Sequence, residues 1–186
     1  MTNADLPLSN NQSLRILRLS HLYRLIIGLA LVVLISSDID EQVLDLANNT
    51  LFRYVSWTYL GCNLLFAAWV RNPSQLLQVF TVALLDVVML SALFYAAGGS
   101  PSGIGNLLIV AVAIANILLR GRIGLLIAAV AAIGMIYLTF YQSISRPAAA
   151  NQYLQAGALG ALCFAAAIVL QGLTRRLQLS ESLSAQ

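Results

Sequence analysis

The sequence predicts an all-α integral membrane protein with six transmembrane helices, arranged as three hairpins with both termini in the cytoplasm. Its 186 residues are 60% apolar and only 9% charged, and its mean hydropathy is +0.84. Soluble domains carry about 25% charged residues, so the chain lies far outside that class. Six long apolar runs, separated by short polar connections, predict the number of crossings. Because most residues are needed to cross a bilayer this often, we expect no separate soluble enzyme in this length.

The six apolar runs define the predicted helices in chain order. They cover residues 22–37, 51–70, 76–97, 104–119, 123–141 and 153–173. Each is expected to be helical, because a lipid-exposed backbone has to satisfy its own hydrogen bonds. The first and fourth runs are short, since 16 residues rise only about 24 Å against a hydrocarbon core of about 30 Å. We expect the first helix to continue backward through residues 13–21, with Arg18 and Arg24 snorkelling toward water.

The arginines predict which side of the membrane each connection faces. The chain has ten arginines and no lysine. Only Arg53 and Arg146 lie near the acidic and glycine-rich connections of one side. By the positive-inside rule the other side, which holds both termini, is cytoplasmic. Because the arginines are scattered at helix ends rather than gathered in a patch, nucleic acid is not an expected partner. The eight arginines on the cytoplasmic side are Arg15, Arg18, Arg24, Arg71, Arg120, Arg122, Arg175 and Arg176.

The remaining segments predict the domain organisation. Residues 1–21 form a cytoplasmic segment leading into the first helix, and residues 22–173 form the membrane domain. On the outer side only residues 38–50 are long enough for structure of their own, with one or two helical turns expected at 41–47. Any signal is therefore met within the membrane or at its surface. Residues 174–186 are polar and lack Gly and Pro, so we expect the sixth helix to continue as a cytoplasmic output rod starting at Arg175 and Arg176.

One acidic residue, Asp86, lies ten residues into the third predicted helix, near the middle of the bilayer. A charge at that depth costs about 3 kcal/mol, so such a residue usually faces other helices, finds a partner or stays protonated. Pairing residues symmetrically about the turn at 71–74 places Tyr59 opposite Asp86, with Asn63 one turn along the same face. We therefore predict an intramembrane polar cluster of Tyr59, Asn63 and Asp86. Two roles stay open: hydrogen bonding between helices, at about 0.6–2 kcal/mol per bond, or recognition of a ligand or partner.

Small residues recur every four positions in the last two predicted helices. Gly124, Ala128 and Ala132 form one such series, and Gly157 with Ala161 forms another. This spacing lets helix backbones approach one another closely. Three uses stay open: packing within the bundle, formation of a homodimer, or docking of a transmembrane helix from another protein.

No residue pattern predicts catalysis, a bound cofactor or a metal site. Cys62 and Cys163 lie singly within apolar runs, so we expect buried hydrophobic side chains rather than a disulfide or a zinc site. The glycine-flanked serines at 98–103 superficially resemble a nucleophile site, but the only histidine, His21, lies on the other side of the membrane. We expect a tight turn there instead, with glycines at positive φ.

Three polar residues at the inner helix ends are expected to be structural. His21 is predicted to anchor the first helix at the membrane interface rather than to act as a titrating switch. Asn116 and Gln171 lie near the inner ends of the fourth and sixth predicted helices, where water or a neighbouring backbone can satisfy their amides.

Several segments are similar to a known family. They are ILRLSHLYRL at 16–25, the stretch through Asp86, GG at 98–99, PSGIG at 101–105, ANILLRGRI at 115–123, QAG at 155–157 and LCFAA at 162–166. Together they resemble the six-helix membrane domain at the N-terminus of the PilS sensor histidine kinases of type IV pilus two-component systems. The resemblance covers roughly residues 16–176.

The resemblance implies a multi-pass sensor domain in a bacterial inner membrane. In that family the membrane domain recognises the major pilin before its assembly, and a high level of membrane pilin lowers signalling to the response regulator PilR, which activates pilin transcription. Our own hypothesis is that the pilin's transmembrane helix docks laterally against the small-residue faces of the bundle. The PAS, phosphoacceptor and ATP-binding modules of such kinases follow the membrane domain, so we expect these 186 residues alone to be no enzyme and to bind no ATP. His21 is not the family's phosphoacceptor, because the sequence that follows it lacks that motif.

Two other readings stay open beside the sensor. A small transporter or channel subunit could use Asp86 as an ion or proton site. Against it, the sequence shows neither paired halves with interrupted helices nor a second membrane acid for a relay. A purely structural assembly subunit is the other alternative.

Overall fold

The structure is a computed structural model that describes residues 10–36, 48–69, 76–119, 121–145 and 150–184. Side chains are described for residues 21–36, 48–67, 77–119, 121–144 and 151–173. Each predicted apolar run falls within one helix, apart from at most one residue at its end, and the described ranges contain no strand, so the all-α prediction is confirmed. The turns predicted at 41–47 lie outside the described residues. The elements are α1 (Asn10–Ser36), α3 (Asn49–Trp69), α4 (Leu76–Ala96), the 3-10 helix η1 (Ser100–Ser102), α5 (Ile104–Leu118), α6 (Arg122–Ser145) and α7 (Ala150–Ser184).

Three helices contain a described segment that is long and apolar enough to cross a membrane. These segments are Leu77–Ala96 in α4, Arg122–Ile144 in α6 and Asn151–Leu173 in α7. Shorter apolar segments lie in α1 and α5, at His21–Ser36 and Ile104–Leu118. α3 is less apolar than α4 because polar residues, including an arginine, lie along it. Length and composition alone therefore identify three of the six predicted crossings.

The first and last helices extend well beyond their apolar segments. α1 has 27 residues and starts at Asn10, somewhat before the expected start at residue 13. α7 has 35 residues and continues without a break through the polar stretch that ends at Ser184. A helix of 35 residues is about 52 Å long, against a hydrocarbon core of about 30 Å. Part of α7 therefore has to project out of any bilayer that it crosses.

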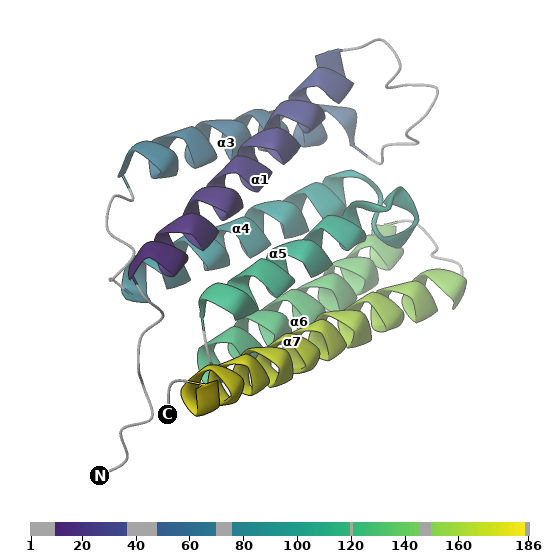
Figure 1. Cartoon of the computed structure of the whole chain (residues 1–186). Helices are drawn as coiled ribbons and strands as arrows, with labels where there is room; N and C mark the ends of the chain where they lie inside the picture. Colours follow the sequence, from purple (N-terminus) through teal and green to yellow (C-terminus); the bar gives the residue numbers. More distant parts are fainter. Residues whose placement is uncertain (1–9, 37–47, 70–75, 120, 146–149, 185–186) are drawn as a thin grey trace.

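Consecutive helices alternate in direction and lie side by side in one bundle (Figure 1). α1 and α3 form a pair at one side, α6 and α7 a pair at the other, and α4 and α5 lie between them. α3 packs on α4, whereas α1 has little contact with α5 and still less with α4. We call the end where α1 begins the near end, and the end where α1 finishes and α3 begins the far end. The pair of α1 and α3 is thus attached to the other helices mainly through α3.

Hydrogen bonds at the far end join helices that are distant in sequence. The backbone N–H of Asn48 donates to the carbonyl of Ala96 (3.1 Å), so α3 starts beside the end of α4. The side-chain amide of Gln142, in α6, donates to the carbonyl of Tyr95 in α4 (2.6 Å). These bonds satisfy carbonyls at the end of α4 that no intrahelical donor can reach. The far end is therefore a connected cap over α3, α4 and α6.

The predicted glycine-rich turn between α4 and α5 belongs to the same cap. Gly98, Gly99 and Gly103 have φ angles of +95°, +83° and +73°, values that residues with a Cβ rarely adopt. The expected turn with glycines at positive φ is confirmed. Within it, the hydroxyl of Ser100 donates to the carbonyl of Gln152 in the first turn of α7 (3.2 Å).

A separate polar contact closes the near end. The amide nitrogen of Gln171, in α7, donates to Asn116 Oδ1 (3.0 Å) and to the carbonyl of Gly121 (2.8 Å). Asn116 in turn donates to the carbonyl of Val112 within α5 (2.9 Å). The two residues expected to be satisfied by water or backbone thus also bond to each other. They fasten α7 to α5 and to the turn that precedes α6.

The interior between these two ends is apolar and rich in alanine. Its largest fully buried apolar side chains include Phe52, Leu90, Phe94, Leu108 and Met135. Buried alanines between them, in α4, α5, α6 and α7, let the helix backbones approach closely. Lipid tails provide no hydrophobic force between helices, so this packing and the polar contacts have to hold the bundle together.

The two cysteines are both free but differ in burial. Cys163 is fully buried in α7, as expected, whereas Cys62 in α3 is only partly buried. Within the part of the chain that the structure describes, no group of three metal-ligating side chains occurs.

Substituting Gly99 is expected to destabilise the far end more than substituting Gly103. Gly99→Ala forces a side chain into φ +83° and ψ −142°, close to a region that only glycine occupies readily, at about 1–3 kcal/mol, and its Cβ would also meet Gln142 Oε1 at 2.5 Å. Gln142 would then have to leave the Tyr95 carbonyl. Gly103→Ala meets nothing within 4 Å and has the backbone strain alone. Thermal unfolding in detergent, followed by exposure of the Cys163 thiol in a Cys62→Ser background, measures both.

The matched control is Gly157→Ala, at an open helical position where φ is ordinary. Its midpoint should stay unchanged or rise slightly, because alanine favours helix. Equal unfolding midpoints for the Gly99→Ala and Gly103→Ala proteins would contradict this prediction. They would show that Gln142 accommodates the added methyl group at position 99 without loss of stability.

Candidate functional site

The candidate site is centred on Asp86, halfway along α4. The Asp86 side chain is only 3% exposed, although it lies in a segment apolar enough to span a membrane. α4 presents it toward α1 and α3, on the same side as the buried residues Ala83 and Leu90. The surrounding helices therefore remove this carboxylate from lipid.

An arginine from α1 pairs with the carboxylate. Arg24 Nε donates to Asp86 Oδ2 (3.2 Å), and both side chains are 3% exposed. The expectation that Arg24 snorkels to water is wrong. Arg24 shares one face of α1 with the buried residues Ile27, Gly28 and Leu31, so its side chain turns into the bundle. Since a guanidinium stays charged in proteins, an acidic partner is the alternative to an unpaired buried charge.

The second carboxylate oxygen is bound by α3. Tyr59 OH donates to Asp86 Oδ1 (2.8 Å), and Tyr59 is fully buried. Each oxygen of Asp86 therefore has a donor, one from α1 and one from α3. We call Arg24, Tyr59 and Asp86 the Asp86 cluster.

Asn63, the third residue of the predicted cluster, lies beside it without joining it. Its side-chain amide donates to the carbonyl of Tyr59, one turn earlier in α3 (2.8 Å), and Asn63 is 5% exposed. Such a bond to the i−4 carbonyl satisfies the side chain within its own helix. Pairing residues about the turn at 71–74 therefore correctly predicts that Tyr59 lies beside Asp86. It does not predict Arg24, the partner from α1.

The Asp86 cluster is the main polar link between α1 and α4, whose backbones hardly approach each other. Burying a charged pair contributes little net stability, because desolvation offsets the attraction. Removing one partner, however, leaves an uncompensated buried charge and costs about 3–5 kcal/mol. The cluster therefore specifies one arrangement of α1, α3 and α4 more than it strengthens the fold.

The first series of small residues is inside the bundle. Gly124, Ala128 and Ala132 are buried in α6. A Cβ on Gly124 would overlap with the Asn116 side chain, so glycine is needed where α6 passes the near-end polar contact. Ala132 faces Gly160 of α7, whose added Cβ would lie 3.4 Å from that of Ala132. This series packs α6 against α5 and α7.

The second series faces outward. Gly157 and Ala161 are exposed on α7, and a Cβ on Gly157 would meet nothing within 4 Å. Leu154, Leu162 and Ala165 are also exposed on this helix. We call Leu154, Gly157, Ala161 and Ala165 the outer face of α7. At Gly157, Ala161 and Ala165 this face carries only small residues, so another helix backbone could come close there.

The remaining predicted residues are placed as follows. Arg175 and Arg176 lie within α7, but their side chains are outside the described set. His21 is half-buried one turn before Arg24, and its Nε2 is buried without a hydrogen-bond partner among the described residues.

Comparison with known families finds a match over residues 7–184, described as the PilS-like transmembrane domain. The chain belongs to this family. The match spans every α-helix that the structure describes, so the family and the sequence agree that these residues form a transmembrane domain. No solved structure is detectably similar to the chain.

A curated relative supports the same assignment. The chain is 60% identical over 179 residues to the sensor protein kinase PilS of Pseudomonas aeruginosa, and the alignment covers 96% of the chain. It spans only 34% of that relative's length. The similarity therefore concerns the transmembrane part of a sensor kinase, and the kinase activity belongs to the whole relative.

The Asp86 cluster is expected to behave as a coupled unit in stability measurements. Asp86→Leu strands the Arg24 guanidinium and the Tyr59 hydroxyl, so the free energy of unfolding should fall by about 3–5 kcal/mol. Adding Arg24→Met removes the stranded charge and should recover at least half of that loss. Tyr59→Phe should cost about 1.5–3 kcal/mol, as for a hydrogen bond to a charged group. Unfolding by dodecyl sulfate in mixed micelles, followed by circular dichroism, measures the three variants and the parent protein.

If the double variant is no more stable than Asp86→Leu alone, Arg24 is not buried against Asp86. The pair would then be absent in the folded protein in detergent.

Proposed function

We propose that this chain is the membrane input domain of a sensor histidine kinase, one that detects pilin inside the bacterial inner membrane by helix-to-helix contact. Signalling to the response regulator PilR would then adjust pilin transcription. The observation that carries the proposal is membership of the PilS-like transmembrane domain family, with 60% identity to a sensor kinase over nearly the whole chain. ATP binding and phosphotransfer are proposed for the kinase modules of the full-length protein.

The proposed topology has three helix hairpins, with residues 1–21 and 174–186 in the cytoplasm and residues 22–173 in the membrane. Burial of Arg24 removes it from the positive-inside count, which leaves seven of nine arginines on the cytoplasmic side. The excess of arginines therefore still lies on the side that holds both termini. Under this topology the near end of the bundle faces the cytoplasm and the far end faces the periplasm.

The outer face of α7 is the proposed docking site for the pilin helix. Gly124, Ala128 and Ala132 are buried against neighbouring helices and cannot receive a partner unless the bundle opens. Gly157 and Ala161 are exposed, and α7 is the least buried of the three spanning segments. The same helix leads past Arg175 and Arg176 to Ser184. A helix docked on this face would therefore act directly on the element that leaves the membrane.

The Asp86 cluster is proposed to hold the bundle in one signalling state. A ligand shifts an equilibrium between two states only through its differential affinity for them. A buried ion pair that specifies how α1 and α3 meet α4 provides such a discrete arrangement. Pilin would favour or oppose it from α7 through the packed helices α4 and α5.

The transporter alternative gains no support from this geometry. Both Asp86 oxygens accept hydrogen bonds from protein donors, and the carboxylate is neutralised by Arg24. An ion or proton site needs a carboxylate that its cargo can reach, whereas this one is 3% exposed.

Photocrosslinking in cells is expected to locate pilin on α7. A photoreactive amino acid placed in turn at Leu154, Ala161 and Ala165 should give an adduct that appears only when pilin is expressed. Matched probes at Ile133 and Phe140, exposed on α6, should give markedly weaker adducts. Mass spectrometry identifies the adduct, and a band of twice the chain mass would reveal a homodimer instead.

Absence of pilin adducts at every α7 position, with normal expression and strong adducts on another helix, would move the docking site. Absence at all positions on all helices would remove direct pilin binding from the proposal.

Neutralising Asp86 in the full-length kinase is expected to change pilin-dependent signalling. Asp86→Asn keeps the shape of the side chain but removes the charge that pairs with Arg24, so the arrangement it specifies is weakened. Transcription of a pilin-promoter reporter with and without pilin should show a response reduced at least threefold. An unchanged response, at equal protein level in the membrane, would reduce the cluster to a structural link.

A further inference from the structure

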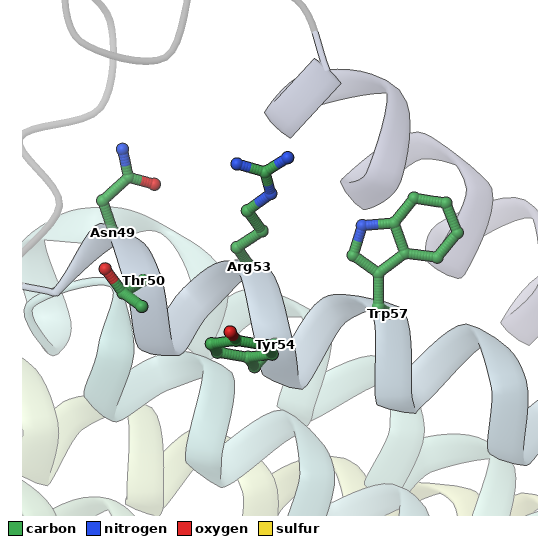
Figure 2. A pocket seen from close by; sticks show the side chains of 5 residues that line it. All are labelled: Asn49, Thr50, Arg53, Tyr54 and Trp57. Atoms are coloured by element: carbon green, nitrogen blue, oxygen red, sulfur yellow. The ribbon is translucent and has the colours of Figure 1, made fainter.

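A hollow of about 430 Å³ lies at the far end of the bundle, beside the first two turns of α3 (Figure 2). All of its described lining residues belong to α3, and all are polar or aromatic: Asn49, Thr50, Arg53, Tyr54 and Trp57. No acidic side chain is among them. The hollow is therefore lined by hydrogen-bond donors, aromatic rings and one positive charge.

Arg53 is the charged group of this hollow. Its side chain is exposed, and within the described ranges nothing forms an ion pair or a hydrogen bond with it. Arg24 differs because its guanidinium already pairs with Asp86. Under the topology proposed above, Arg53 also lies on the side of the membrane where arginine is rare. Because no described side chain binds it, the Arg53 guanidinium can bind an anion at this position.

The side chains around Arg53 add donors on the same side of α3. Asn49, Arg53 and Trp57 follow at intervals of four residues, and Figure 2 shows all three pointing to one side, with the nitrogen-bearing edge of the indole turned toward Arg53. Asn49 is not needed to cap α3, because Asn48 Oδ1 accepts from the N–H of Leu51 (3.0 Å). Three donor groups thus border one space.

The position of the hollow is that of lipid headgroups. The hydrogen bond from Asn48 to Ala96 sets the start of α3 level with the end of the apolar segment Leu77–Ala96. Arg53 is therefore about one turn inside the apolar boundary, from which its stem can reach outward to the phosphate level. Tyr and Trp concentrate at the same level of a bilayer, where Tyr54 and Trp57 would flank a glycerol backbone.

We infer that Asn49, Arg53 and Trp57 form a binding site for the phosphodiester of an anionic phospholipid. The guanidinium fork of Arg53 matches two phosphate oxygens, and the amide of Asn49 and the indole N–H of Trp57 donate to the remaining headgroup and ester oxygens. Since the described lining offers no carboxylate to a headgroup amine, the site selects a net negative lipid over a zwitterionic one. This inference does not depend on pilin sensing.

Quenching of tryptophan fluorescence by brominated lipids tests the site in the full chain. The chain has two tryptophans, so Trp69→Phe leaves Trp57 as the only reporter. The protein is reconstituted in phosphatidylcholine vesicles that contain a small fraction of brominated phosphatidylglycerol or, in parallel, brominated phosphatidylcholine. One arginine near a membrane surface contributes about fivefold in local lipid preference. We therefore expect Trp57 to be quenched by the phosphatidylglycerol at about fivefold lower mole fraction.

Matched variants assign the preference to the hollow. Arg53→Gln should abolish it and Arg53→Lys should retain part of it, because lysine keeps the charge but loses the fork. Arg122→Gln removes an arginine that is exposed at the opposite end of the bundle and should leave the preference intact. Circular dichroism confirms folding of each variant.

Equal quenching by both lipids in the parent protein would overturn the inference, and so would a preference that survives Arg53→Gln. A third arm separates lipid from free phosphate. Millimolar inorganic phosphate, at constant ionic strength, should not release the brominated lipid. Release would show that the hollow takes a soluble phosphate ion, which also overturns the lipid site.

Discussion

The buried ion pair between Arg24 and Asp86 is the constraint on which the arrangement of the first three helices depends. The backbones of α1 and α4 hardly approach each other, so the guanidinium and the carboxylate, with the Tyr59 hydroxyl, specify how α1 sits relative to α4, while α3 also packs on α4 directly. In lipid no hydrophobic force draws helices together, and a charge without its partner is far more costly than a charge with one. The cluster therefore excludes many alternative packings for a small gain in stability.

The other half of the bundle is held by different means. α5, α6 and α7 approach closely along buried glycines and alanines, and polar contacts fasten them at each end, through Ser100 and Gln152 at one end and Gln171 at the other. This leaves α7 with a broad exposed face and a long continuation beyond the apolar segment. The proposed detection of pilin inside the bilayer would use this combination of an open face and a long polar continuation of the same helix.

The length and spacing of the apolar runs predicted the helices and their order, because a backbone that faces lipid satisfies its own hydrogen bonds only as a helix. Symmetry about a short turn also placed Tyr59 beside Asp86. Arg24 was missed because an arginine at the end of an apolar run satisfies the positive-inside rule equally well when it faces water or the interior. The pattern of Arg24 with Ile27, Gly28 and Leu31 on one face carried the missing information. For the small-residue series, spacing alone could not separate the buried face of α6 from the exposed face of α7.

The hydrogen bonds of Gln171 have a mechanical consequence. They attach α7 to the body of the bundle just before the polar continuation begins, so Gln171 is the natural fulcrum of that helix. Gly157 and Ser184 lie 14 and 13 residues from it, which makes the two arms nearly equal at about 21 and 20 Å. If pilin binding, as proposed, tilted α7 about Gln171, the buried contacts of α7 with α5 and α6 and the bond between Ser100 and Gln152 would have to yield, and Gly157 and Ser184 would move by nearly the same distance in opposite directions. The helix would act as a balanced lever, reversing the direction of a displacement while preserving its size.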